Sequence, residues 1–121
     1  MSLPQGKKHT ILCFCCNDDA RLTHAALLHQ GYHVLASSNG FEIMELCTRE
    51  PVDAVVLDLD RNCAEVALIA RTIKQCRPQV PTIVLAETPA PVDGLHELAH
   101  MIVPRADHAE LVRSLQKLLT A

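Results

Sequence analysis

The fold of this chain is decided by residues 53–59, which read DAVVLDL. Four apolar residues in succession, 54–57, are typical of a parallel strand that is buried on both faces. Asp58 ends this run, so its carboxylate is expected at the carboxyl edge of the sheet, where open α/β folds bind their ligands. A charge inside the strand would be costly, whereas a charge at this edge can contact solvent and ligands. We therefore expect any functional site to be built around Asp58.

Length and composition predict one domain. A chain of 121 residues can bury a single core, and its 49% hydrophobic residues include no stretch near the ~20 needed to span a bilayer. The net charge of −3, with no basic run, gives no support to nucleic-acid binding. Residues 1–8 are short and polar and lack the pattern of a signal peptide. We expect a cytoplasmic protein with a flexible tail, 1–9, and one domain, 10–121.

The six cysteines do not form a recognisable motif. No CxxC pair is present, and in the absence of a secretory signal reduced thiols are expected rather than disulfides. Cys13, Cys15 and Cys16 fall in the first apolar run, where cysteine behaves as a small hydrophobic residue.

Short β-rich runs alternate with longer helical ones along the chain. Gly31 is expected to end the first helix, and Ser38 or Asn39 to cap the second. Five such units predict an α/β domain, in which a five-stranded parallel sheet carries helices on both faces. The predicted strands are 10–16, 33–37, 54–58, 82–86 and 101–103, and the predicted helices are 19–30, 41–49, 63–76, 91–98 and 106–119.

From residue 10 to residue 119 the chain resembles the receiver domain of bacterial two-component response regulators. The resemblance rests on the acidic cluster 17–19, on GYHV at 31–34, on SNGFE at 38–42, on the strand that ends at Asp58, and on PTIVL at 81–85 and Val103-Pro104. It implies a flavodoxin-like sheet of strand order 2-1-3-4-5, with the site at the carboxyl ends of strands 1 and 3. It further implies that Asp58 accepts a phosphoryl group from a sensor histidine kinase. The ligands that it implies for Mg²⁺ are Asn17, Asp18, Asp19 and Asp58.

Three family positions are degenerate in this chain. The lysine before the proline of the fifth strand is replaced by Val103, and the hydroxyl residue that ends the fourth strand is replaced by Ala86. Glu87 follows Ala86, and its charge is expected to repel a phosphoryl group. The aromatic switch residue of the fifth strand aligns with His100. We therefore predict a pseudo-receiver whose crevice lacks a cation, with Mg²⁺ binding and phosphorylation of Asp58 weakened or lost.

A degenerate receiver is expected to act through protein–protein contact rather than as an enzyme. Its partner would be a sensor histidine kinase or another signalling protein, not nucleic acid or a membrane, and homodimerisation through the last helices is left open. The competing interpretation of Asp18 and Asp19 is a helix N-terminus, where the helix dipole favours carboxylates. The competing interpretation of Asp58 is that its carboxylate is inherited and has no function.

Cys15 and Arg21 suggest a first enzymatic alternative. Their separation matches the phosphate loop of low-molecular-weight phosphotyrosine phosphatases, which place a thiolate within a ring of backbone amides and an arginine. Residues 16–20, CNDDA, contain no glycine and bring two carboxylates to the place of the phosphate. Like-charge repulsion makes this alternative the weaker one.

A second alternative is the zinc motif HExxH, which occurs as His96-Glu97-Leu98-Ala99-His100. That motif needs a rigid helix and a third ligand downstream, for which His108 and Glu110 would be candidates. The segment is short and is expected to turn into the fifth strand at His100. A surface helix with two chance histidines is therefore expected.

Overall fold

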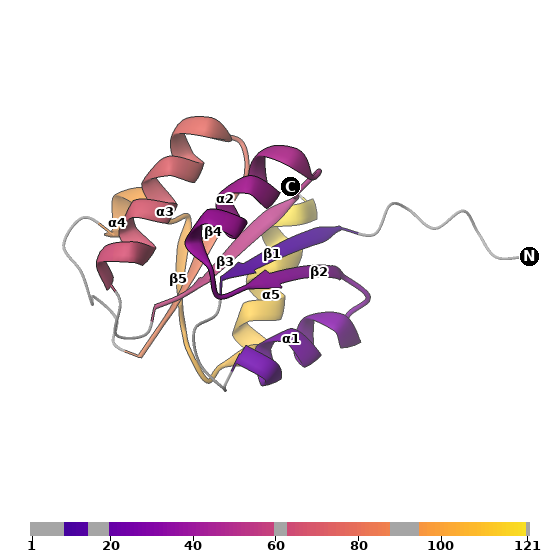
Figure 1. Cartoon of the computed structure of the whole chain (residues 1–121). Helices are drawn as coiled ribbons and strands as arrows, with labels where there is room; N and C mark the ends of the chain where they lie inside the picture. The colour runs from indigo at the N-terminus through magenta and orange to yellow at the C-terminus, as the bar shows by residue number, and fades with distance from the viewer. Residues whose placement is uncertain (1–8, 15–19, 60–62, 88–94, 121) are drawn as a thin grey trace, which may run out of the picture.

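Five parallel strands form one sheet in the order β2-β1-β3-β4-β5 in a computed structural model, which describes residues 9–14, 20–59, 63–87 and 95–120 (Figure 1). β1 lies between β2 and β3, and Leu12 is level with Leu35 on one side and with Val55 on the other. β3 pairs with β4, and β4 pairs with β5 at the edge. The predicted strand order and fold class are confirmed.

The strands and helices alternate along the chain as expected. The predicted ranges 33–37, 54–58, 63–76 and 82–86 are reproduced. The last helix begins two residues later than predicted, because Asp107 caps it: the Asp107 side chain accepts a hydrogen bond from the N–H of Glu110 at 3.0 Å. Residues 15–16 of the first predicted strand and 91–94 of the fourth predicted helix lie outside the described residues. The elements are β1 Thr10–Phe14, α1 Ala20–His29, β2 His33–Ser37, α2 Gly40–Arg49, β3 Ala54–Asp58, α3 Cys63–Cys76, β4 Thr82–Ala86, α4 Leu95–Leu98, β5 Met101–Pro104 and α5 His108–Thr120.

Helices cover both faces of the sheet, which gives three layers (Figure 1). On one face, Leu27 of α1 and Leu111 and Leu115 of α5 pack on alternate residues of the strands, and all three are fully buried. On the other face, Ile43 of α2 and Ile73 of α3 pack on the intervening strand residues. Because successive strand residues point to opposite faces, a sheet covered on both sides requires continuous apolar strands. This requirement explains the apolar run 54–57.

The predicted signals at two helix ends are confirmed. Gly31 has a φ of 88°, and its N–H donates to Leu28 O at 2.9 Å while the N–H of Tyr32 donates to Leu27 O at 3.3 Å, the pattern of a Schellman motif. At the start of α2, Asn39 rather than Ser38 is the cap, since its Oδ1 accepts a hydrogen bond from the N–H of Glu42 at 3.1 Å. These two ends fix the short connections on either side of β2.

Among the described helices, none has the length and apolar character required to cross a bilayer.

Candidate functional site

Asp58 is the last residue of β3 and lies at the carboxyl edge of the sheet, as predicted. It is level with Leu85 of β4, and the next N–H, that of Leu59, donates to Leu85 O at 2.8 Å. Its side chain is only 5% exposed. A carboxylate with so little access to water is destabilising unless a charged or hydrogen-bonding partner compensates it.

Arg105 provides that partner. Its Nε donates to Asp58 Oδ1 at 2.8 Å, and its own side chain is 13% exposed. The backbone holds the arginine in place, because the N–H of Arg105 donates to Ala86 O at 3.0 Å one residue beyond the end of β5. The prediction that the crevice lacks a cation is therefore wrong. The charge is carried by the residue after the proline instead of the residue before it.

Val103 and Arg105 lie on either side of Pro104, the last residue of β5. Val103 is part of the strand, whereas Arg105 begins the turn that follows it. Val103 is 1% exposed and packs in the core cluster beneath α1 and α5, whereas Arg105, beyond the end of β5, reaches over the edge of the sheet. The one hint in the sequence was a basic residue directly after Pro104, although the sequence does not show where its side chain points.

Glu87 contacts the same guanidinium group. Its Oε1 accepts a hydrogen bond from Arg105 Nη1 at 2.9 Å, although the Glu87 side chain remains 75% exposed. Glu87 was expected to repel a phosphoryl group, and in the structure its charge is partly neutralised by Arg105. The three charged groups together carry one net negative charge, so an incoming phosphoryl dianion would still be repelled.

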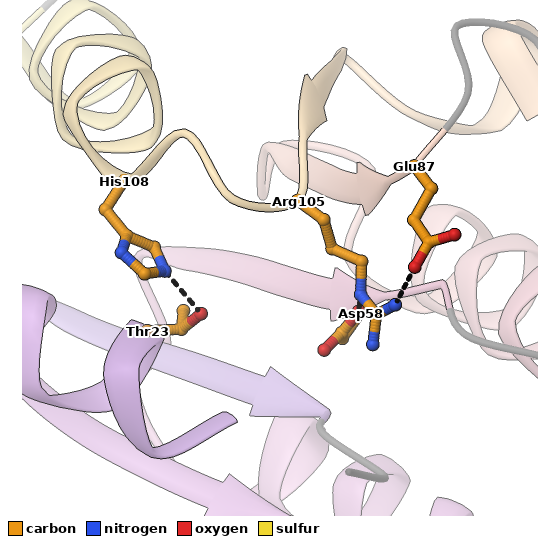
Figure 2. Close-up of polar contacts among 5 residues, drawn as sticks. All are labelled: Thr23, Asp58, Glu87, Arg105 and His108. Carbon is orange, nitrogen blue, oxygen red and sulfur yellow. Dashed lines mark hydrogen bonds and ion pairs between the residues drawn. The ribbon is translucent and has the colours of Figure 1, made fainter. Parts of the chain in front are cut away.

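A cleft of about 590 Å³ opens beside this charged group. Figure 2 shows Arg105 reaching toward Asp58 and Glu87, while the His108 ring points toward Thr23. His108 Nε2 lies 3.3 Å from Thr23 Oγ1, which joins the first turn of α5 to α1 across the cleft. Among the described residues, Leu22, Pro104 and Ala106 also line the cleft.

Oxygen ligands for a cation are only partly visible at this cleft. Asp58 supplies a carboxylate of the kind that Mg²⁺ prefers, while Ala86, 2% exposed, supplies no oxygen from its side chain. The other predicted ligands, Asn17, Asp18 and Asp19, lie outside the described residues. Within the described parts of the chain, no three His, Cys, Asp or Glu side chains are grouped to hold a metal ion.

His100 lies at the other end of the strands, beside Thr82, the first residue of β4. It immediately precedes β5, its N–H donates to Thr82 O at 2.8 Å, and its Nδ1 accepts a hydrogen bond from the N–H of Thr82 at 3.0 Å. The position of the expected aromatic switch is thus held to the backbone of β4. His108, proposed as a third ligand of the zinc motif, instead lines the cleft beside Asp58. In the described part of the chain, the helix of that motif, α4, spans only Leu95–Leu98.

Of the two residues that suggested a phosphatase, the structure describes only Arg21. Arg21 lies exposed in the first turn of α1, and Cys15 is outside the described residues. The cleft beside Asp58 is lined by Leu22 and Thr23 of α1, not by Arg21.

Solved structures of receiver domains share this fold. The receiver domain of the sensor histidine kinase PA1611 from Pseudomonas aeruginosa PAO1, which has a magnesium ion in its active-site cleft, is 23% identical with a TM-score of 0.79 over 95% of this chain and 100% of that chain. The chemotaxis protein CheY4 of Vibrio cholerae is 15% identical with a TM-score of 0.81, over 93% of this chain and 100% of that chain. The response regulator TrrA from Thermotoga maritima, in complex with Mg²⁺ and BeF, is 20% identical with a TM-score of 0.77, over 93% of this chain and 100% of that chain.

Neither the protein-family models nor the curated proteins contain a match to this chain. The structural matches show that the chain has the fold of a response regulator receiver domain, and the predicted resemblance is confirmed at the level of the fold.

Proposed function

We propose that this chain is a pseudo-receiver of a two-component pathway, which signals by protein–protein contact and in which Arg105 suppresses phosphoryl transfer to Asp58. Its partner would be a sensor histidine kinase or another signalling protein of the same pathway. The observation that carries the proposal is the ion pair of 2.8 Å between Arg105 Nε and Asp58 Oδ1.

Phosphoryl transfer to a carboxylate requires an oxygen that can attack in line and a cation that neutralises the transferring group. In this chain Oδ1 of Asp58 already accepts a hydrogen bond from Arg105. Glu87 holds a second edge of the same guanidinium group, so the arginine is anchored between two carboxylates. An arriving phosphoryl group would have to displace Asp58 from the arginine and also meet the charge of Glu87.

Magnesium binding at Asp58 should be weak for the same reason. Two like unit charges about 4 Å apart repel each other by roughly 4 kcal/mol at an effective dielectric constant of about 20, and the repulsion doubles when one of the two ions is divalent. Asn17, Asp18 and Asp19 remain our candidate ligands beside Asp58, since carboxylate and amide oxygens suit Mg²⁺. Bound Mg²⁺ would neutralise the charge that builds up on a transferring phosphoryl group.

The test is a magnesium titration followed by the amide shifts of Asp58 and Leu59. Arg105→Gln removes the charge while keeping a polar side chain, and it should bind Mg²⁺ at least about tenfold more tightly than the wild type. Arg105→Lys retains the charge and should behave like the wild type. Equal affinities for the wild type and Arg105→Gln would contradict a blocking role of the arginine.

Acetyl phosphate provides the second measurement. Wild-type protein incubated with acetyl phosphate and Mg²⁺ should show little gain of mass, and any gain should disappear in Asp58→Asn. Rapid and complete modification of wild-type Asp58 would show instead that the relay works, and the chain would then be an ordinary receiver.

A further inference from the structure

The outer surface of α2 and α3 exposes apolar side chains that do not line the Asp58 cleft. Phe41 is 85% exposed and Leu68 is 59% exposed. They belong to the four large apolar side chains that are exposed among the described residues, and the other two, Leu22 and Leu28, both lie on α1. Exposed apolar side chains that share one surface mark an interaction site more often than scattered ones do.

Phe41 and Leu68 line a common groove. α2 and α3 pack side by side on one face of the sheet (Figure 1), and the groove between them has a volume of about 240 Å³. Met44 and Ile69 complete its apolar lining, and Thr72 lies at one end. Gly40 also lines the groove, and a Cβ added there would make an ordinary contact with Ile69 Cδ1 at 3.6 Å.

Charge is distributed unevenly along this α2–α3 surface. Both helices start near the carboxyl edge of the parallel sheet, so their first turns lie at the same end. Glu42 and Glu65 occupy those first turns. Arg49 ends α2, and Arg71 lies in the second half of α3. Glu45, between the two ends, has its Oε2 3.9 Å from Arg49 Nη1.

Glu42 and Glu65 thus lie toward one end of the surface and Arg49 and Arg71 toward the other, with the apolar groove and the Glu45–Arg49 pair between them, and such a polarity is complementary to itself. A two-fold axis through the apolar middle would bring the acidic end of one copy to the basic end of the other, since each contact in such an interface occurs twice. Other partners would need to match both the apolar groove and this polarity. A second copy of the chain, related by this axis, places its apolar groove against the apolar groove and its basic end against the acidic end.

We propose that the α2–α3 surface is a homodimer interface, in which two copies pack antiparallel with Phe41 and Leu68 at the centre. Glu42 and Glu65 of each copy then face Arg49 and Arg71 of the other. The interface is small, so the dimer is weak and exchanges rapidly, with a dissociation constant in the micromolar range. It is separate from the Asp58 cleft and does not depend on the pseudo-receiver proposal. It also differs from dimerisation through the last helices, which the sequence left open.

Sedimentation velocity over a range of protein concentrations tests this interface, on the full chain with reductant present because Cys76 is exposed. The wild type should show a reversible monomer–dimer equilibrium. Phe41→Asp and Leu68→Asp replace exposed side chains, so the fold should survive, as circular dichroism can verify. Each should weaken the dimer at least about tenfold, because a charge is placed at the centre of the interface. Leu28→Asp is the matched control: it changes an exposed leucine of α1 and should leave the equilibrium unchanged.

Charge reversal tests the antiparallel arrangement. Glu65→Arg and Arg71→Glu should each weaken the dimer, and the double variant should regain much of the lost affinity, because the opposite charges meet again across the axis. A wild type that stays monomeric at its highest soluble concentration would overturn the proposal, even if another protein binds through Phe41. A dimer that survives Phe41→Asp but dissociates on substitution of exposed α5 residues would overturn it as well, in favour of the last helices.

Discussion

Arg105 Nε lies 2.8 Å from Asp58 Oδ1, although the two residues are 47 positions apart in the sequence. The contact joins the end of β3 to the segment that follows β5, across the intervening strand β4. Both side chains are largely removed from water. Their pairing compensates the burial of both charges at the carboxyl edge of the sheet, and it engages Oδ1 of Asp58.

Removal of Arg105 should destabilise the fold, because it takes away the positive charge that is paired with the buried Asp58 carboxylate. We expect Arg105→Ala to lower the free energy of unfolding by about 3 kcal/mol at pH 7, measured by urea denaturation. Glu87→Gln removes the exposed partner of the same arginine and should cost less than about 1 kcal/mol. A combined Asp58→Asn and Arg105→Ala variant should recover part of the loss, since no buried charge remains. Equal costs for Arg105→Ala and Glu87→Gln would show that burial of Asp58 contributes little.

The scaffold was predictable because its signals are local. The run 54–57 indicated a strand buried on both faces, and this strand is β3 with the predicted bounds. Gly31 and Asn39 indicated helix ends, and each has the backbone geometry or hydrogen bond that its residue type favours. The position of Asp58 at the carboxyl edge followed from the end of the apolar run.

The charge at the site was not predictable in the same way. Family similarity directed attention to Val103, whereas the cation comes from Arg105, which lies beyond the strand and belongs to no periodic pattern. Whether its side chain turns toward Asp58 depends on the β4–β5 register and on the hydrogen bond from its N–H to Ala86 O. Such tertiary geometry is absent from local sequence, and the contribution of Asn17, Asp18 and Asp19 stays a prediction.

Two glycines should respond to substitution in opposite directions. Gly31 has a φ of 88°, in the left-handed region, and no atom lies within 4 Å of a Cβ built there, so Gly31→Ala should cost about 1 kcal/mol through backbone strain alone. Gly40 has no positive φ, and its added Cβ would make an ordinary contact with Ile69 Cδ1 at 3.6 Å. Gly40→Ala should therefore raise the stability by up to about 1 kcal/mol, since it restricts the unfolded chain.

Guanidinium denaturation of both glycine variants beside the wild type gives the comparison, at one protein concentration. Gly31→Asn serves as a check on the cause, because asparagine tolerates the left-handed region better than alanine and should cost less. If Gly31→Asn and Gly31→Ala were equally destabilised, the loss would have to come from something other than the backbone conformation.

Cys47 should make the stability of the fold depend on alkaline pH. Burial raises the pKa of the Cys47 thiol above its usual value; the nearby Arg77 lowers it and Cys76 raises it further, but burial has the largest effect. The unfolded thiol ionises near pH ~8.5, whereas the folded one retains its proton to higher pH. The stabilisation is therefore complete below the unfolded pKa and is lost as the pH rises toward the folded pKa, by at most about 1.4 kcal/mol per pH unit.

The measurement is the free energy of unfolding of the wild type and of Cys47→Ala between pH 7 and pH 9.5 (about one unit above the ordinary thiol pKa). The alanine variant should be less stable at pH 7, because it removes a packed side chain from the core beside Ile43 and Ile73. Its deficit should shrink as the pH rises, since only the wild type loses the contribution of this thiol. Peptide mapping after brief alkylation of the folded protein gives an independent readout: Cys76, which is exposed, should be labelled before Cys47, which is buried. A deficit that stays constant across this pH range, together with rapid labelling of Cys47, would mean that the thiol is not held in the core.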